Sequence, residues 1–221
     1  MTIHPLTDLP DGAVAHRVTA RPTTIAGREA VRVELPDEVS RHGRPGIDYI
    51  DQPTFMLIPA SFTTGTIRVD IWSRLNGKGP ADARAFAGLA YRINDQRDAF
   101  ESVYLRPLNG AKTNPPPPRD RRAIQYFAYP DWPFGRLRDV YPDGRYEAGL
   151  DIGPEEWITL ELAVTTASVT ATVNGVPALT IDQPKAPPHA GALGLFVDIG
   201  TEAFFSNLII DEVTSAGPSE E

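Results

Sequence analysis

Apolar and polar residues alternate with a period of two in segment after segment, and this pattern most constrains what the chain can fold into. The clearest case runs from Gly65 to Arg74, where Ile67, Val69 and Ile71 share one face and polar side chains occupy the other. Long segments of helical periodicity are missing, and the 22 prolines and 18 glycines are scattered between the alternating segments. The pattern predicts an all-β chain of short strands separated by turns.

Further segments have the alternation or the β-branched and aromatic composition of strands. They are Glu29 to Leu35, Phe86 to Ile93, Phe100 to Arg106, Arg122 to Tyr129, Trp157 to Thr165, Ser168 to Val173, Val176 to Ile181, Leu193 to Asp198 and Ala203 to Ile210. Asn174-Gly175 lies between two of these segments and is the strongest short hairpin signal in the chain. The series predicts a two-sheet antiparallel β-sandwich or jelly roll.

The domain organisation follows from composition along the chain. No shift in composition marks a linker, so residues 1–213 are expected to form a single β-sandwich domain. The run Pro115 to Pro118 lies between two predicted strands and fits a stiff loop. Residues 214–221 are small, polar or acidic and are predicted to form a flexible C-terminal tail.

Charge and composition exclude several classes of protein. The net charge of −8 argues against a general binder of nucleic acid or of anionic membranes. The absence of cysteine excludes disulfides and thiolate metal sites. No apolar run approaches transmembrane length, and the N-terminal residues lack the basic and apolar regions of a signal peptide. We therefore expect a cytoplasmic protein.

Two motifs carry a resemblance to a known superfamily. Phe100-Glu-x-x-Tyr-x-Arg-Pro-x-Asn-Gly110 and Gln125-Tyr-x-x-x-Pro-x-Trp132 resemble bacterial proteins of the concanavalin A-like lectin/glucanase superfamily. The segments from Gly191 and from Ala203 look like the last two strands of laminin-G-like and 3-keto-disaccharide-hydrolase-like domains. The resemblance implies a concanavalin A-like jelly roll with a ligand groove on its concave sheet. It also implies a protein that binds or processes carbohydrate.

The chain departs from the enzymes of that superfamily in two motifs. The Glu-x-Asp-x-x-Glu strand that supplies two carboxylates in laminarinase-type hydrolases is missing. The Gln-x-His strand of alginate lyases is missing too. Whether the protein is an enzyme therefore stays open; if it is, a glycoside hydrolase or lyase using general acid–base catalysis is expected. The alternatives are a non-catalytic interaction module, or an enzyme that acts on a non-sugar small molecule in the same groove.

Glu101, Tyr104 and Glu147 are the candidate catalytic residues. Each glutamate lies near aromatic residues, which can raise the pKa of a carboxyl group and make it a general acid, with Tyr104 as its partner. The alternative is a glutamate that pairs with Arg106 or Arg138. On a regular strand Glu101 faces away from Tyr104 and Arg106, so the three share a face only if a bulge intervenes.

The candidate ligand-binding residues are guanidinium, amide and aromatic side chains. They are Arg106, Asn109, Gln125, Tyr129, Trp132, Arg138 and Trp72. Guanidinium groups and amides can hold hydroxyls or a carboxylate, and rings offer a flat surface to a sugar. Several of them have a structural alternative. The rings could pack in the core, and Trp72 could lie on a convex outer surface. The arginines near the proline run could pair with aspartates of their loop, or they could attract an anionic substrate such as a uronate or a phosphate.

No metal or other cofactor is expected. The four histidines are dispersed, without ligand spacing. The segment Asp198 to Glu202 could offer oxygens to calcium, but it lacks a dense acidic loop and fits a turn better. The expected partner is a small molecule or an oligosaccharide, and a homodimer through edge strands remains an alternative.

Overall fold

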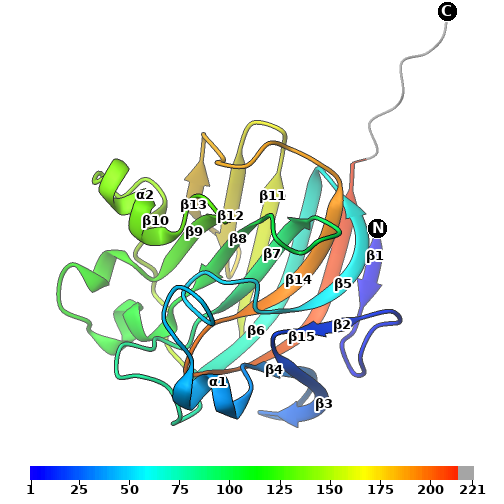
Figure 1. The fold of residues 1–221 in the computed structure, drawn as a ribbon, viewed down its shortest axis with the longest axis horizontal. Helices are drawn as coiled ribbons and strands as arrows, with labels where there is room; N and C mark the ends of the chain where they lie inside the picture. The colour runs from blue at the N-terminus through cyan, green and yellow to red at the C-terminus, as the bar shows by residue number, and fades with distance from the viewer. Residues whose placement is uncertain (214–221) are drawn as a thin grey trace, which may run out of the picture.

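Two antiparallel β-sheets packed face to face make up the protein in a computed structural model that describes residues 1–213 (Figure 1). The predicted flexible tail, residues 214–221, lies outside the described residues. The eight-stranded sheet has the order β13 (Val176–Ile181), β12 (Val169–Val173), β11 (Ile158–Val164), β6 (Gly65–Leu75), β15 (Thr201–Glu212), β4 (Arg28–Glu34) and β3 (Thr19–Ile25), with β1 (Thr2–His4) paired to β15.

The second sheet has seven strands. Its order is β10 (Glu147–Ala148), β9 (Ile124–Tyr129), β8 (Phe100–Leu105), β7 (Ala87–Ile93), β14 (Gly191–Val197), β5 (Phe55–Phe62) and β2 (Val14–His16). The helical elements are short: α1 (Asp37–His42), α2 (Phe134–Val140) and the 3-10 turns η1 (Pro107–Asn109), η2 (Ala111–Thr113) and η3 (Arg119–Arg121). In Figure 1, α2 and the loop that carries the 3-10 turns lie beside β8, β9 and β10.

The predicted β-sandwich is confirmed, and each strand expected from alternation is present with its ends shifted by a few residues at most. The Asn174-Gly175 hairpin joins β12 and β13 as expected, and both turn residues adopt positive φ. The prediction did not include β5, whose sequence is apolar on both faces and does not alternate. It also did not include the three N-terminal strands, the two-residue strand β10 or the two helices.

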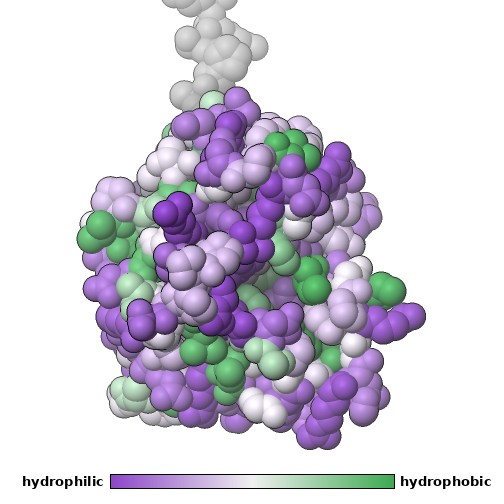
Figure 2. Space-filling view, turned by 90° about the vertical axis from the view of Figure 1, so that its left-hand side faces the viewer, coloured by the Kyte–Doolittle hydropathy of each residue, from purple (hydrophilic) through white to green (hydrophobic). Residues whose placement is uncertain are grey.

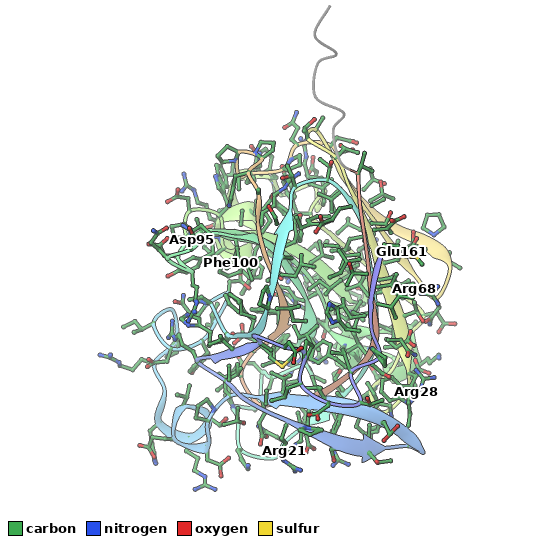
Figure 3. The ribbon with its side chains drawn as sticks, turned by 90° about the vertical axis from the view of Figure 1, so that its right-hand side faces the viewer. Arg21, Arg28, Arg68, Asp95, Phe100 and Glu161 are labelled. Carbon is green, nitrogen blue, oxygen red and sulfur yellow. The ribbon has the colours of Figure 1, made fainter. Side chains whose placement is uncertain are left out.

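The core lies between the two sheets and follows the alternation. Ile67, Val69 and Ile71 of β6 are fully buried, while Arg68 between them is exposed. From the other sheet, Arg92 donates from Nη2 to the carbonyl of Thr165 at 2.7 Å, across the gap between β7 and the end of β11. Figure 3 shows Arg28, Arg68 and Glu161 on one side of the sandwich and Phe100 in the opposite sheet.

The outer face of the seven-stranded sheet is also covered. Tyr104, Phe127 and Phe196 share this face and pack together, with ring centroids 5.4 to 5.8 Å apart, and all are buried. The segment around Asp51 and the start of α2 lie over them, joined by a 2.6 Å hydrogen bond from the Phe134 N–H to Asp51 Oδ2. This cover explains why β8 is buried on both faces and forms the floor of the site described below.

Across residues 1–213, no helix has the length and apolar character needed to cross a membrane.

Candidate functional site

A pocket of about 210 Å³ lies on the outer face of the seven-stranded sheet, where β8 ends. We call it the arginine pocket because five arginines line it. They are Arg84, Arg106, Arg119, Arg122 and Arg138. Its other walls include aromatic rings, the amide of Asn109 and two carboxyl groups, contributed by Tyr49, Phe86, Tyr104, Phe134, Asp82 and Asp198.

The end of β8 positions two of these side chains. Pro107 has no backbone N–H to continue the sheet, so the chain leaves β8 and turns through η1. The Arg106 N–H is still held by the Ala123 carbonyl at 2.7 Å, and Asn109 lies at the end of the turn. Gly110 follows, and its backbone lies so close to that of Ile152 that a Cβ at this position would be 2.0 Å from the Ile152 carbonyl oxygen. Only glycine fits there without a shift of the backbone.

Tyr104 and Arg106 meet in the pocket, as their shared face predicts. Arg106 is only 5% exposed and donates from Nη2 to the Tyr104 hydroxyl at 2.5 Å. Its guanidinium carbon lies 5.0 Å from the ring centroids of both Tyr104 and Phe134. Burial raises the pKa of Tyr104 far above its ordinary value, despite the nearby Arg106 charge, so the phenol stays protonated.

Asp51 completes this group and was not among the residues singled out in the sequence. The Tyr104 hydroxyl donates to Asp51 Oδ1 at 3.3 Å. Burial raises the pKa of Asp51 to about 7, and the carboxylate of Asp198 acts in the same direction, while the Phe134 N–H and Arg106 oppose them. A carboxyl group that exchanges a proton near neutral pH therefore lies directly behind the tyrosine that lines the pocket.

Two buried polar atoms at the pocket have no partner among residues 1–213. They are Arg106 Nε and Asn109 Oδ1. The Asn109 amide donates from Nδ2 to the Arg122 carbonyl at 3.0 Å, which fixes the side chain and leaves its oxygen unused. A buried polar atom without a partner costs about 1–3 kcal/mol, so these atoms favour a bound water or ligand that can satisfy them.

Arg122 and Arg138 form one side of the pocket, and both pair with Glu147 behind them. Arg138 donates to Glu147 Oε2 from Nη2 at 2.5 Å and from Nε at 2.9 Å, and Arg122 donates from Nε to Glu147 Oε1 at 3.1 Å. Both arginines line the pocket, whereas Glu147 lies behind them. The predicted catalytic residue Glu147 therefore holds two pocket arginines in place and does not itself line the pocket.

Glu101 lies outside the pocket. β8 pairs with β7 and β9 without a register shift, so Glu101 faces opposite to Tyr104 and points between the sheets. It is fully buried, with an ion pair of 2.8 Å to Arg92 and a hydrogen bond of 2.6 Å from the Tyr126 hydroxyl. Burial raises the pKa of Glu101, as the sequence suggested, but the partners are structural and no bulge brings this carboxyl to the tyrosine.

The other aromatic and amide candidates lie near the pocket but do not line it. Gln125 is fully buried and donates from Nε2 to the carbonyls of Tyr126 and Tyr146 at 2.7 and 3.1 Å. Tyr129 and Trp132 line a separate hollow with Lys185, whose Nζ lies 5.0 Å from the Trp132 ring. This hollow is apolar and keeps Trp132 half-buried, so it is a second surface on which a ring could stack.

Trp72 belongs to the opposite side of the molecule. It lies on the outer face of the eight-stranded sheet, where its ring packs edge-on against Phe204 at 5.4 Å and is 5% exposed. Arg74 lies over the same ring at 5.4 Å. The structure therefore separates Trp72 from every other predicted binding residue by the full thickness of the sandwich.

The segment Asp198 to Glu202 contains the turn between β14 and β15 and the first two residues of β15. Asp198 accepts the backbone N–H groups of Ile50, Asp51 and Ile199 at 3.1, 2.9 and 2.7 Å, and Glu202 pairs with Arg32 and Arg74. Within residues 1–213, no group of three or more histidine, aspartate or glutamate side chains is arranged to hold a metal ion.

Sequence reasoning identified four residues that line the pocket: Tyr104, Arg106, Asn109 and Arg138. It missed Arg84 and Phe86, which reach the pocket from the segment before β7, and Asp51, which lies behind Tyr104 and accepts a hydrogen bond from its hydroxyl. A local signal for them was weak, because an isolated aspartate or arginine in a loop resembles any solvated turn residue. Figure 2 shows the side of the molecule on which these loops lie, with mainly hydrophilic residues around a hollow near its centre.

Comparison with known proteins places the fold. No protein-family model matches the chain, and no curated protein matches it either. A carbohydrate binding module, CBM66 from Bacillus subtilis, superposes with a TM-score of 0.56 at 12% identity, covering 89% of this chain and 93% of the module. A Bacillus subtilis protein of unknown function with a galectin-like fold superposes with a TM-score of 0.58 at 11% identity, covering 96% of this chain and 95% of the other.

The chain has a concanavalin A-like sandwich fold. At these identities the likeness extends to the fold alone, and the arginine pocket is described from this chain's own residues.

Proposed function

We propose that this protein binds a carbohydrate and that the ligand occupies the arginine pocket. The observation that carries the proposal is the buried pair Tyr104–Arg106 on the pocket floor, together with the unpartnered Arg106 Nε and Asn109 Oδ1. The hydroxyls of a sugar both donate and accept hydrogen bonds, so one such ligand can offer an acceptor to the guanidinium and a donor to the amide oxygen.

The pocket's shape and walls fit the same ligand class. Its volume of about 210 Å³ is below the roughly 300–1,000 Å³ of pockets for drug-sized ligands, which favours one sugar ring over a long chain. The rings of Phe86 and Phe134 line it and offer flat apolar surface next to the polar groups. A similar structure is described as a carbohydrate binding module, and the last two strands resemble those of 3-keto-disaccharide-hydrolase-like domains; both support a sugar ligand.

Binding without turnover is the form of the proposal that the geometry favours. Glu101 is sealed between the sheets and Glu147 is paired with two arginines, so neither predicted acid reaches the pocket. The retaining and inverting mechanisms of glycosidases need two carboxyl groups flanking one bond. The lining carboxyl groups are Asp82 and Asp198, and Asp198 already accepts three backbone hydrogen bonds.

Thermal-shift measurement with mono- and oligosaccharides tests the proposal. A ligand that binds only the folded protein increases the free energy of unfolding and so raises the unfolding midpoint. The increase is about 2.7 kcal/mol when the ligand concentration is a hundred times its Kd. We expect the shift to disappear in Asn109→Ala and to persist in Arg68→Gln, which changes an exposed arginine on the outer face of the eight-stranded sheet. A folded protein that shifts with no sugar would contradict the proposal and favour a protein partner or a non-sugar ligand.

A second candidate function, carbohydrate processing, rests on Asp51. Its pKa of about 7 and its contact with the Tyr104 hydroxyl would allow proton exchange with a ligand through the tyrosine. A bound sugar that is converted to a product by the unaltered protein, but only bound by Asp51→Asn, would support turnover. If the unaltered protein binds the sugar but forms no product, carbohydrate processing is contradicted and only the binding function remains.

A further inference from the structure

The charges of the arginine pocket are unbalanced. Five guanidinium groups line it together with two carboxyl groups, Asp82 and Asp198, in a protein whose net charge is −8. Glu147 lies behind the wall and is shared by Arg122 and Arg138, so one negative charge faces two positive ones. Positive charge is therefore concentrated at one point on an otherwise acidic molecule.

Three of the arginines have no ion pair within residues 1–213. Arg84 donates from Nη1 to the carbonyls of Ala81 and Ala83 at 2.8 and 2.6 Å, which are neutral acceptors. Arg106 donates to a neutral phenol and keeps Nε free. Arg119 forms no side-chain hydrogen bond or ion pair in that part of the chain. Their positive charges are therefore available to a ligand.

The arginines also oppose one another. Burial lowers the pKa of Arg84, and the charges of Arg119 and Arg106 lower it further. Burial likewise lowers the pKa of Arg138, and the charge of Arg106 acts in the same direction. Like charges held together in a partly buried space destabilise the empty pocket, and an anion placed among them removes that repulsion.

From these contacts we propose that the sugar bound in the arginine pocket carries an anionic group, a carboxylate, sulfate or phosphate, held by Arg84, Arg106 and Arg119. This inference rests on the proposed function and specifies its ligand. The planar guanidinium group matches such anions with two parallel hydrogen bonds, and its charge strengthens them. The Asn109 oxygen and Asp82 remain as acceptors for the hydroxyls of the ring.

Matched sugar pairs test the inference by calorimetric titration. Galacturonate is compared with galactose, glucuronate with glucose, and glucose 6-sulfate and glucose 6-phosphate with glucose; inorganic sulfate and phosphate are titrated alone. We expect at least one acidic sugar to bind about tenfold or more tightly than its neutral partner. Raising the ionic strength from about 0.02 M to about 0.5 M should reduce that difference, because salt screens the attraction.

Charge-removing variants assign the effect to the pocket. Arg84→Gln and Arg119→Gln should each reduce the preference for the acidic sugar over its neutral partner about tenfold. The matched control is Arg121→Gln, which removes an exposed arginine of the same loop that does not line the pocket, and should leave the preference unchanged. The Arg119 side chain makes no hydrogen bond or ion pair within residues 1–213, so its variant keeps the test valid if Arg84→Gln unfolds.

The outcomes separate this inference from the proposed function. Equal binding of acidic and neutral sugars would overturn the anionic ligand and leave carbohydrate binding standing. Inorganic sulfate or phosphate bound as tightly as the sugar acids would also overturn it, because the ring would contribute nothing. Failure of every sugar to bind would overturn the proposed function and this inference with it.

Discussion

At the scale of single residues, Asp51 shows how burial sets the chemistry of a side chain. Its carboxyl group is 2% exposed and contacts the Tyr104 hydroxyl and the first N–H of α2. Those donors favour the charged form, yet burial outweighs them and raises the pKa to about 7. The aspartate is therefore partly protonated at neutral pH.

Asp51→Asn should change how stability depends on pH. The raised pKa means that the folded protein holds this proton more tightly than the unfolded chain, so its contribution is complete below about pH 4. The contribution is lost as pH rises through about 7. The free energy of unfolding of the variant relative to the unaltered protein should therefore increase from pH 4 to pH 8, by up to about 4 kcal/mol. Urea unfolding at several pH values measures this difference.

The control for that experiment is Asp82→Asn, which changes an exposed carboxyl group at the same pocket. Comparing the two variants separates the effect of the buried carboxyl group from the effect of removing a charge at the pocket. Parallel pH profiles for the unaltered protein and Asp51→Asn would show that the buried carboxyl does not titrate near neutrality.

The alternation of side chains along β8 determined which of the predicted residues face the pocket. Tyr104 and Arg106 were expected to share a face and do so, and Glu101 was expected to face the other way unless a bulge intervened. The register is continuous, so the glutamate lies in the core with Arg92. Parity is a local property, which is why the sequence could predict it.

At the scale of elements, the turn η1 positions Asn109 in the pocket, directly after Arg106. It begins after Arg106 and ends at Asn109. The next residue, Gly110, lies directly against the backbone of Ile152. A side chain at Gly110 would have to push the two backbones apart. The φ of Gly110 is −72°, which any residue can adopt, so backbone conformation does not require glycine here. Glycine is required because a side chain would clash with Ile152.

Gly110→Ala should therefore destabilise the protein by about 1–3 kcal/mol, as overpacking does, and weaken ligand binding because Asn109 shifts. The matched control is Gly135→Ala in α2, where a Cβ meets nothing within 4 Å. Alanine there should stabilise the helix by about 0.5–1 kcal/mol and leave binding unchanged. Denaturant unfolding and titration of both variants measure the effects; equal behaviour of the two would contradict the packing argument.

At the scale of the whole molecule, the sheet edges bear on the oligomeric state. The seven-stranded sheet ends in β10 and β2, which have only two and three residues. The eight-stranded sheet ends in β3, which contains Arg21 and Pro22, and in β13, which contains Pro177. Short strands, prolines and charged residues are features that discourage pairing between sheet edges.

We therefore expect a monomer in solution, although a homodimer through edge strands was the alternative left open by the sequence. Light scattering coupled to size-exclusion chromatography measures the mass directly across a range of concentrations. A stable dimer would show that the partner docks on a face of the sandwich or that an edge pairs despite these features.

The sequence by itself determined ten of the fifteen strands, their inward faces and the sandwich they form, because alternation and turn residues are properties of neighbours along the chain. It also identified Tyr104, Arg106, Asn109 and Arg138, which lie in or close to regular elements near one another in sequence. Only the tertiary structure showed that Asp51, Arg84 and Phe86 join them. It also decided that Trp72 and Glu101 lie elsewhere. Loops from distant parts of the chain cover the outer face of one sheet, and which side chains they bring together depends on packing between segments that no local pattern records.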